Sequence, residues 1–386
     1  KTLSEDSLES QGLDPWVQWV SVHTGKPSTI HKVLRIGDVP KLESPQIWEK
    51  LSERGISSGL WGLMNASRNN AKKSKIFLPD PWAFTQIAYP NSLNYYLDLP
   101  RCYSKNYILP SKIKLFKGFL KFIYFFLRKN MFFGFLKVSM KALLIILKNG
   151  FKNITLFSLF DMFNSFTFLK YKKVKNPDLS IIFLNSLAHL QHHFWNDHQI
   201  NNEMKMCLRV LDDIFGLLLN SIKANESIIV INALSQRNVF NKGIYIYRQK
   251  DSKNILSVLN IKYKSFEEGM TNDGHIFFNS LEQCNYAFLI LSNAKINDNA
   301  LFYVERDKKD KNKLFFQCCY KNKVGVNDHF ITNDKLFRFF DYFTLIRERT
   351  GEHVNKGDIL SEKLYFPEKL KNHEIYEYLY KHFENN

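Results

Sequence analysis

Histidines and an asparagine follow a short apolar run in the segment Asn176 to Trp195, NPDLSIIFLNSLAHLQHHFW. The apolar run, residues 179–184, predicts a buried strand. The polar residues after it are Asn185, His189, His192 and His193. Ligands of open α/β sheets bind at the carboxyl ends of strands, and imidazole nitrogens bind zinc and other divalent transition metals. The segment is therefore a candidate metal site. The alternative is a polar loop with surface histidines that begins a helix, and on this segment alone it is the more common case.

Three other segments carry polar residues of the same kind. They are Ser21 to His31 (SVHTGKPSTIH), the apolar run 228–231 with residues 232–236 after it (NALSQ), and Arg349 to His353 (RTGEH). Taken singly, a histidine in such a segment is more often structural than a metal ligand. The order of the segments along the chain carries more information than any one of them.

In that order the segments resemble the motifs of the alkaline phosphatase superfamily, in its type I phosphodiesterase/nucleotide pyrophosphatase branch. Asn185 and His189 match the family's Asp-x-x-x-His, whose two residues bind one metal. His353 matches the histidine of a late Gly-x-His segment that completes this site. The resemblance implies a site for zinc or another divalent cation at Asn185, His189 and His353, with His193 as a further nitrogen donor.

Several positions depart from the family's pattern. Asn185 stands where the family has a metal-binding Asp. Residues 24–31 match TG-x-x-P-x-x-H after the nucleophile helix, and the expected nucleophile position, nine residues before this stretch, is Pro15. Ala233 and Leu234 replace the Asp and His of the second metal site. One metal position is therefore the most that the family's motifs support here.

The resemblance implies a metal-dependent phosphoester hydrolase that acts on a small phosphorylated or glycan substrate. A bound ion would polarise the phosphoryl oxygens and activate a water, which would replace the missing protein nucleophile. The alternative is a catalytically inactive protein, a pseudoenzyme of the same fold that binds a phosphorylated or glycan ligand. Pro15, Ala233 and Leu234 motivate that alternative.

The hydrophobic pattern predicts the elements that would position these residues. Residues 47–54 predict a helix that ends at Gly55, and residues 56–64 predict a Gly-rich strand. A strand at 179–184, a helix at 204–225 and a strand at 227–231 fit a parallel βαβ unit. Strands at 243–247 and 287–291 and a helix at 375–383 follow. With the resemblance, these elements predict an α/β fold, an alkaline-phosphatase-like three-layer sandwich with a mostly parallel central sheet.

The formal net charge of +17 comes mainly from residues 111–175, which hold fourteen Lys or Arg and a single acid, Asp161. Lys114, Lys117 and Lys121 recur at helical spacing with Phe and Leu between them, so the stretch predicts two or three amphipathic helices. Their apolar faces pack on the core in the simpler interpretation. The alternative is that residues 111–175 bind an anionic membrane surface. No nucleic-acid-binding motif accompanies the charge, so a nucleic-acid partner is not supported.

We therefore expect residues 1–100 to form the first part of the α/β core, residues 101–175 an inserted basic helical cap, and residues 176–386 the remainder of the core. The family's first strand, with a metal-binding Asp of its own, would precede Lys1. Five cysteines without a CxxC pair predict neither a disulfide framework nor a zinc–thiolate site.

Overall fold

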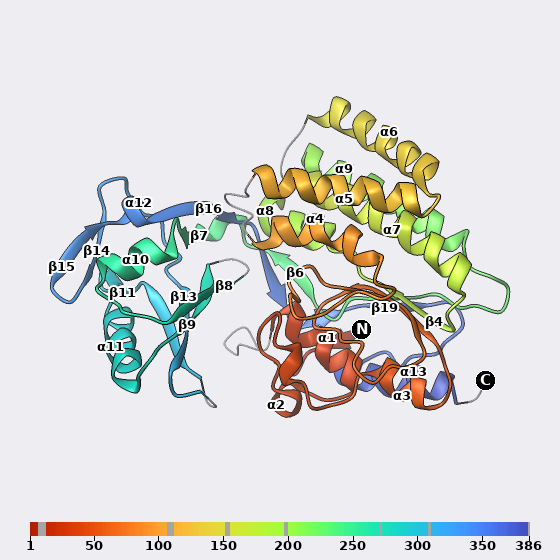
Figure 1. The fold of residues 1–386 in the computed structure, drawn as a ribbon, viewed down its shortest axis with the longest axis horizontal. Coiled ribbons are helices and arrows are strands. Elements are labelled where there is room, and N and C mark those ends of the chain that lie inside the picture. The colour runs from red at the N-terminus through yellow and green to blue at the C-terminus, as the bar shows by residue number, and fades with distance from the viewer. Residues whose placement is uncertain are drawn as a thin grey trace. The chain divides into compact units, whose positions relative to one another are not determined.

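The structure is a computed structural model that describes residues 1–6, 13–105, 112–150, 155–196, 200–269, 272–307 and 310–384. It is a mixed α/β protein with several separate sheets (Figure 1). The chain divides into two compact units, Lys1–Asn238 with Gly351–Asn386 (unit 1), and Val239–Thr350 (unit 2). No helix in the described residues has the length and hydropathy needed to cross a membrane.

Unit 1 contains a three-stranded parallel sheet in the order β3–β2–β4. Its strands are β2 (Ser58–Leu63), β3 (Ser74–Pro79) and β4 (Leu179–Ile182). Leu60 of β2 pairs with Phe77 of β3 on one side and with Ile181 of β4 on the other. The strands predicted at 56–64 and 179–184 are confirmed. The larger parallel sheet of the predicted sandwich is not found in the described residues.

Side chains alternate between the two faces of this sheet, so each face has its own hydrophobic core. On one face Trp61, Ile76 and Leu78 pack against α4 (Leu93–Lys105), α5 (Lys112–Arg128) and α7 (Thr155–Lys175). On the other face Leu60 and Phe77 pack against α3 (Ile47–Glu53) and α13 (Ile375–His382). Helices thus cover both faces of the sheet (Figure 1).

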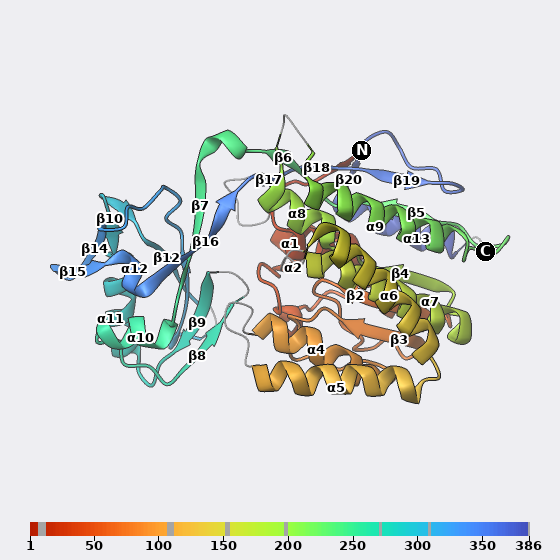
Figure 2. The same cartoon turned by 90° about the horizontal axis from the view of Figure 1, so that it is seen from above.

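The predicted basic cap contains three long helices, α5, α6 (Phe132–Asn149) and α7. Helices α4 and α5 lie side by side, as Figure 1 and Figure 2 both show. Helix α7 joins the cap to the sheet, because its Asn164 Oδ1 accepts hydrogen bonds from Trp61 Nε1 (3.0 Å) and from the Tyr96 hydroxyl (2.8 Å). All three side chains are buried, and the paired oxygen offsets the desolvation of both donors.

The remaining elements of unit 1 are short strands and helices around this sheet. They are α1 (Pro15–Thr24), α2 (Ser28–His31), α8 (Ser186–Phe194) and α9 (Asn202–Leu219), with β1 (Thr2–Leu3), β5 (Ile229–Ile231), β6 (Ser235–Asn238), β17 (Gly351–Val354), β18 (Lys356–Gly357), β19 (Ile359–Ser361) and β20 (Leu370–Lys371). Strand β5 pairs antiparallel with β19, and β6 pairs antiparallel with β17. The predicted parallel βαβ unit is wrong, because β4 pairs with β2 while β5 lies in a different sheet. An apolar run indicates a buried strand but not its partner.

Unit 2 has a separate hydrophobic core that includes Phe316, Phe330, Phe339 and Phe343. Its elements are β7 (Ile244–Gln249), α10 (Ser252–Val258), β8 (Ser265–Glu268), β9 (Asp273–Phe277), α11 (Leu281–Ser292), β10 (Lys295–Ile296), β11 (Asn299–Ala300), β12 (Phe302–Arg306), β13 (Lys313–Cys318), β14 (His329–Thr332), β15 (Lys335–Arg338), α12 (Phe339–Tyr342) and β16 (Phe343–Arg349). The sequence patterns did not separate this unit from the rest of residues 176–386.

The strand predicted at 287–291 is instead part of helix α11. The side chain of Ser280 caps this helix by accepting a hydrogen bond from the Gln283 backbone amide at 3.3 Å. Cys284, Ala287 and Leu291 are buried, at the spacing of three and four residues that one helix face requires. A five-residue apolar run does not distinguish a strand from a buried helix. Here the capping residue Ser280, upstream of the run, indicates the helix.

A buried carboxylate on α7 fixes the start of α8. Asp161 Oδ2 accepts hydrogen bonds from the backbone amides of Asn185 (3.1 Å) and Ser186 (2.9 Å). These amides have no partner within the helix, so Asp161 acts as a cap supplied by a distant part of the chain. Burial raises the pKa of Asp161 to about 6, although the hydrogen bonds from Ser186 and Asn185 lower it.

Asp161→Ala is expected to lower the free energy of unfolding by about 2–3 kcal/mol, because two backbone amides lose their acceptor. Asp161→Asn keeps an acceptor oxygen and should cost less. The raised pKa means that the folded state binds a proton that the unfolded state releases between pH 3.8 and about 6. The unaltered protein therefore loses stability as the pH rises through this window, whereas the Asn variant, which has no titrating group at this position, does not. Urea unfolding of the three proteins across this pH range measures both effects. Equal losses in the Ala and Asn variants would contradict the capping role.

Candidate functional site

Helix α8 carries most of the polar residues that the sequence singled out. Asn185 is its N-cap residue, and the side chains of Asn185 and His189 meet with 3.1 Å between Nδ2 and Nε2. Because an amide nitrogen can only donate, His189 Nε2 accepts this hydrogen bond and its lone pair is occupied. The predicted spacing therefore does bring these two side chains together. In the structure the two side chains form a hydrogen bond with each other.

His189 also stacks on an aromatic ring from the basic cap. Its ring centroid lies 4.0 Å from that of Phe157 on α7, with the planes 25° apart. Desolvation in this packed position lowers the pKa of His189 to about 4, because burial disfavours the charged imidazolium. His189 is therefore a neutral imidazole at physiological pH.

A second contact joins α8 to the strand that carries His353. The Nε2 atoms of His192 and His353 lie 3.1 Å apart, and the ring centroids are 4.7 Å apart. His192 is one helical turn beyond His189, and His353 is a buried residue of β17. The structure thus places His192 beside His353. His193, the next residue of α8, has its ring centroid 6.2 Å from that of His192.

Each ring of this histidine pair is oriented through its other nitrogen. His192 Nδ1 lies 2.9 Å from the carbonyl oxygen of Gly351, and this contact requires a proton on Nδ1. His353 Nδ1 lies 3.6 Å from Asp14 Oδ1. Asp14 is the N-cap residue of α1, and its side chain makes no capping hydrogen bond to that helix. Carboxylates and backbone carbonyls in these positions orient histidines that bind metals.

The close approach of β17 to α8 depends on Gly351. A Cβ atom at this position would lie 2.4 Å from the carbonyl oxygen of Gln191, so only glycine fits without a shift of the strand. Gln236 of the paired strand β6 also holds α8, because its Nε2 donates to the Ala188 carbonyl at 3.0 Å. Figure 2 shows α8 beside β6 and β17. Local packing therefore sets the distance between the two imidazoles.

His192 directs the lone pair of its Nε2 at His353, because its Nδ1 carries the proton that the Gly351 carbonyl accepts. In one neutral tautomer His353 donates its Nε2 proton to that lone pair. In the other tautomer the proton is on Nδ1, 3.6 Å from Asp14 Oδ1, and a second lone pair faces the first, where a metal ion would bind both. Two nitrogens bound tetrahedrally to one zinc ion would be about 3.3 Å apart, which is close to the separation found here. The pair therefore fits two ligand positions of a divalent metal.

The described residues do not supply a complete metal site of the family's kind. Within them, no group of three or more His, Cys, Asp or Glu side chains is placed to hold an ion. At the position that matches the family's second site, Ala233 is buried in an apolar cluster with Val22, Leu370 and Ile375 and offers no ligand. What the described residues offer is one pair of facing imidazoles.

The expected nucleophile position carries no hydroxyl, because Pro15 occupies it as the first residue of α1. Ser21 lies 3.1 Å from His31 Nε2, which resembles a nucleophile–base pair. However, His31 Nδ1 accepts a hydrogen bond from the backbone amide of Val33, so the neutral ring carries its proton on Nε2 and donates to Ser21. A base that already holds this proton cannot take one from the serine.

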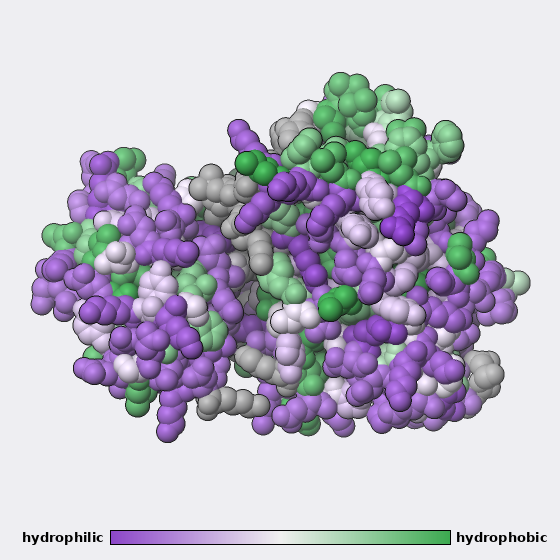
Figure 3. Space-filling model, viewed as in Figure 1, coloured by the Kyte–Doolittle hydropathy of each residue, from purple (hydrophilic) through white to green (hydrophobic). Residues whose placement is uncertain are grey.

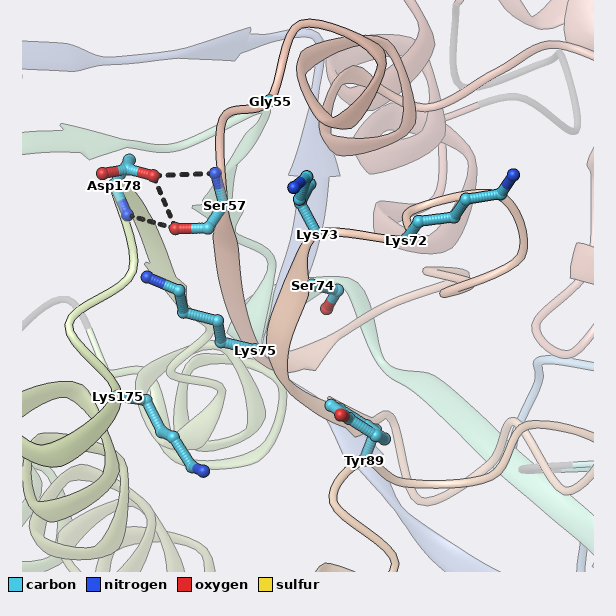
Figure 4. A pocket seen from close by; sticks show the side chains of 9 residues that line it. All are labelled: Gly55, Ser57, Lys72, Lys73, Ser74, Lys75, Tyr89, Lys175 and Asp178. Atoms are coloured by element: carbon cyan, nitrogen blue, oxygen red, sulfur yellow. Dashed lines mark hydrogen bonds between the residues drawn. The ribbon is translucent and has the colours of Figure 1, made fainter.

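A pocket of about 400 Å³ opens at the amino ends of the sheet strands, at the edge opposite the ends that usually bind ligands. Its lining residues are Gly55, Ser57, Lys72, Lys73, Ser74, Lys75, Tyr89, Lys175 and Asp178 (Figure 4). Hydrogen bonds from Ser57 and the charge of Lys75 lower the pKa of Asp178, although burial raises it. Four lysines against one carboxylate make the pocket positively charged.

Comparison with known proteins gives little information about this chain. No protein-family model and no curated protein matches it. Among solved structures, phosphonoacetate hydrolase from Sinorhizobium meliloti 1021 in complex with phosphonoformate is similar over 98% of this chain and 85% of that chain, with 7% identity and a TM-score of 0.37. The same enzyme with phosphonoacetate matches 94% and 82% of the two chains, with 8% identity and a TM-score of 0.35. Likeness at this level does not establish a fold or an activity.

Acid is expected to destabilise the protein through its buried histidines. Burial lowers the pKa of His23 to about 3, and desolvation lowers the pKa values of His31 and His189 to about 4, against 6.5 when exposed. The stability they contribute is complete above pH 6.5 and is lost as the pH falls towards 4, by up to about 1.4 kcal/mol per pH unit for each ring. His189→Phe keeps the ring on Phe157 and removes one such group. Denaturant unfolding should show a shallower loss in this variant, and an unchanged slope would contradict the assignment.

Proposed function

We propose that this chain is a metal-dependent phosphoester hydrolase with a single metal position, held by His192 and His353. The observation that carries the proposal is the pair of Nε2 atoms 3.1 Å apart, each on a ring whose Nδ1 faces an acceptor. This arrangement is typical of histidines that bind a metal, in which the second nitrogen donates to a carbonyl or carboxylate. The hydrolase part of the proposal rests on the resemblance of the motifs around residues 24–31, 185–189 and 349–353.

The protein's residues would have distinct roles in such a site. His192 and His353 would bind the ion, while the Gly351 carbonyl and the Asp14 carboxylate would keep their Nε2 lone pairs directed at it. With two protein ligands, coordination positions stay open for a phosphoryl oxygen and for water. A bound divalent cation would supply positive charge to the phosphoryl oxygens and lower the pKa of a bound water. Because Pro15 occupies the expected nucleophile position, we expect slow turnover.

The ligand set that the family resemblance implies, Asn185, His189, His353 and His193, remains an alternative assignment within the same proposal. Asn185, His189 and His193 lie on the same short helix as His192, and a rotated Asn185 amide would present its oxygen in place of its nitrogen. Zinc is the first candidate ion for nitrogen ligands, and other divalent transition metals are compatible. The division into core parts 1–100 and 176–386 with an inserted cap at 101–175 also remains a prediction.

Cobalt(II) titration followed by absorbance tests the ligand pair. We expect one ion per chain, with at least about a 100-fold loss of affinity in His192→Ala and His353→Ala, and about a tenfold loss in Asp14→Asn. His189→Phe should bind the ion normally, because this ring is not part of the proposed pair. Circular dichroism checks that each variant is folded. If His189→Phe loses cobalt binding while His192→Ala retains it, the ligand set with Asn185 and His189 would be favoured instead.

Hydrolysis of an aryl phosphodiester by the metal-loaded protein tests the reaction itself. Activity should require added metal, disappear with a chelator and be absent from the two alanine variants. A protein that is shown to hold the ion but does not hydrolyse the diester would reject the hydrolase proposal and leave the metal site standing.

A second candidate function is binding of a phosphorylated ligand without turnover, as in a pseudoenzyme. Pro15 at the nucleophile position and the buried Ala233 support it. The lysine pocket is the specific observation that favours it. The ammonium groups of Lys72, Lys73 and Lys175 make no hydrogen bond or ion pair with the described residues, whereas Lys75 donates to the Asn176 carbonyl at 2.9 Å. Such charges suit a phosphate better than a neutral glycan.

Calorimetric titration with inorganic pyrophosphate tests this pocket. The double substitution Lys72→Ala/Lys73→Ala should weaken binding by about tenfold, because two cations that line the pocket are removed. The control Lys295→Ala/Lys335→Ala removes the same charge from exposed positions of unit 2 and should bind normally. An equal loss in both double variants would show a general charge effect and reject the pocket as the site. Retention of binding in His192→Ala separates this result from the metal proposal.

A further inference from the structure

Helices α5 and α6 are apolar on two opposite faces. In α5, Phe122, Phe125 and Phe126 are buried against the core. An amphipathic helix that only packs on a core would be polar on its other side. Here large apolar side chains occupy the solvent side as well. They include Ile113, Phe116 and Leu120 of α5 and Phe133, Leu144 and Leu147 of α6, with exposed fractions between 50% and 87%.

These side chains form regular outward stripes. Residues 113, 116 and 120 of α5 follow the three- and four-residue spacing of one helix face, roughly opposite the buried phenylalanines. In α6, residues 144 and 147 share a face, and residue 133 lies three turns earlier on the same side. Figure 3 shows hydrophobic residues gathered over these two helices on one face of the molecule. We call this the α5–α6 apolar surface.

The charge around this surface has one sign. Between residues 112 and 149 there are nine Lys or Arg and no Asp or Glu. Lys121 and Lys141 pair with Asp98 and Asp213, which lie on neighbouring helices. The ammonium groups of Lys117, Lys137 and Lys148 are exposed and make no ion pair with the described residues. Long basic side chains beside an apolar stripe keep their charge in water while their stems cover apolar surface.

We propose that the α5–α6 apolar surface docks on an anionic lipid surface, with both helices lying in the plane of the interface. Leucine, isoleucine and phenylalanine side chains would enter the acyl boundary, and the lysines beside them would meet anionic headgroups. A second copy of the chain fits less well, because it would bring two sets of nine positive charges together. A nucleic acid would satisfy the charges but offers no partner for the apolar stripes.

Co-sedimentation of the full chain with lipid vesicles tests this proposal. We expect binding to phosphatidylcholine vesicles that contain phosphatidylserine, and much weaker binding to phosphatidylcholine alone. Phe133→Ser/Leu147→Ser should weaken binding by about tenfold or more, because two exposed apolar side chains no longer enter the bilayer. The matched control is Tyr365→Ser/Leu336→Ser. Tyr365 is 87% exposed, as Phe133 is, and Leu336 is 70% exposed, close to the 73% of Leu147. This control should bind as the unaltered protein does.

Charge variants separate the two contributions. Lys137→Glu/Lys148→Glu should reduce binding to the anionic vesicles far more than Lys295→Glu/Lys335→Glu, which changes the net charge equally. Absence of vesicle binding, equal binding to neutral and anionic vesicles, or equal loss in the matched controls would overturn the proposal. Sedimentation velocity without lipid supplies the remaining outcome. Self-association that Phe133→Ser/Leu147→Ser abolishes would assign the surface to a second copy of the chain.

Discussion

The candidate site depends on one buried carboxylate in the helical cap. Asp161 is the only acidic residue between residues 111 and 175, and it accepts hydrogen bonds from the first backbone amides of α8. Its position therefore fixes where α8 begins and the direction in which its histidines point. Ser186, whose amide it holds, also receives a weak contact from Cys207 of α9, at 3.6 Å from sulfur to oxygen. The basic cap thus contributes to the site through its one negative charge.

From that start, α8 offers two different environments to its histidines. His189 turns towards the cap, where Phe157 and Asn185 enclose it and keep it neutral. His192, one turn later, faces β17 and meets His353. The first ring is held by packing, and the second by a carbonyl and by another imidazole. This difference explains why neighbouring histidines of one helix have different chemical capacities, although the sequence presents them alike.

The cap also shows how one helix can meet two unlike environments. The buried faces of α5 and α6 fill the space above the sheet with phenylalanine rings, and their outward faces repeat an apolar stripe. Packing on the core accounts for the first set of residues but not for the second. An apolar stripe in water is unfavourable unless something covers it, and the neighbouring lysines indicate the charge of that partner.

The sequence by itself determined the elements whose pattern is local. The helices at 47–53 and 375–382, two of the three strands of the parallel sheet, and the helices at 112–149 and 155–175 follow from apolar spacing and from caps such as Gly55, whereas strand β3 was not predicted. It also predicted a metal site at residues 185–193 and 353, and this stays a prediction. Periodicity failed at 287–291, where a short apolar run fits a strand and a helix equally well.

The tertiary structure alone decided which of these residues meet. Strand β5 pairs with β19 and not with β4, because pairing depends on long-range packing that an apolar run does not specify. The sequence did not indicate Asp14, nor that His192 rather than His189 meets His353. These contacts join distant segments: His192 is 159 positions from Gly351 and 161 positions from His353. Side-chain type and spacing therefore indicated the chemistry, and the close approach of β17 to α8 at a glycine decided which nitrogens face each other.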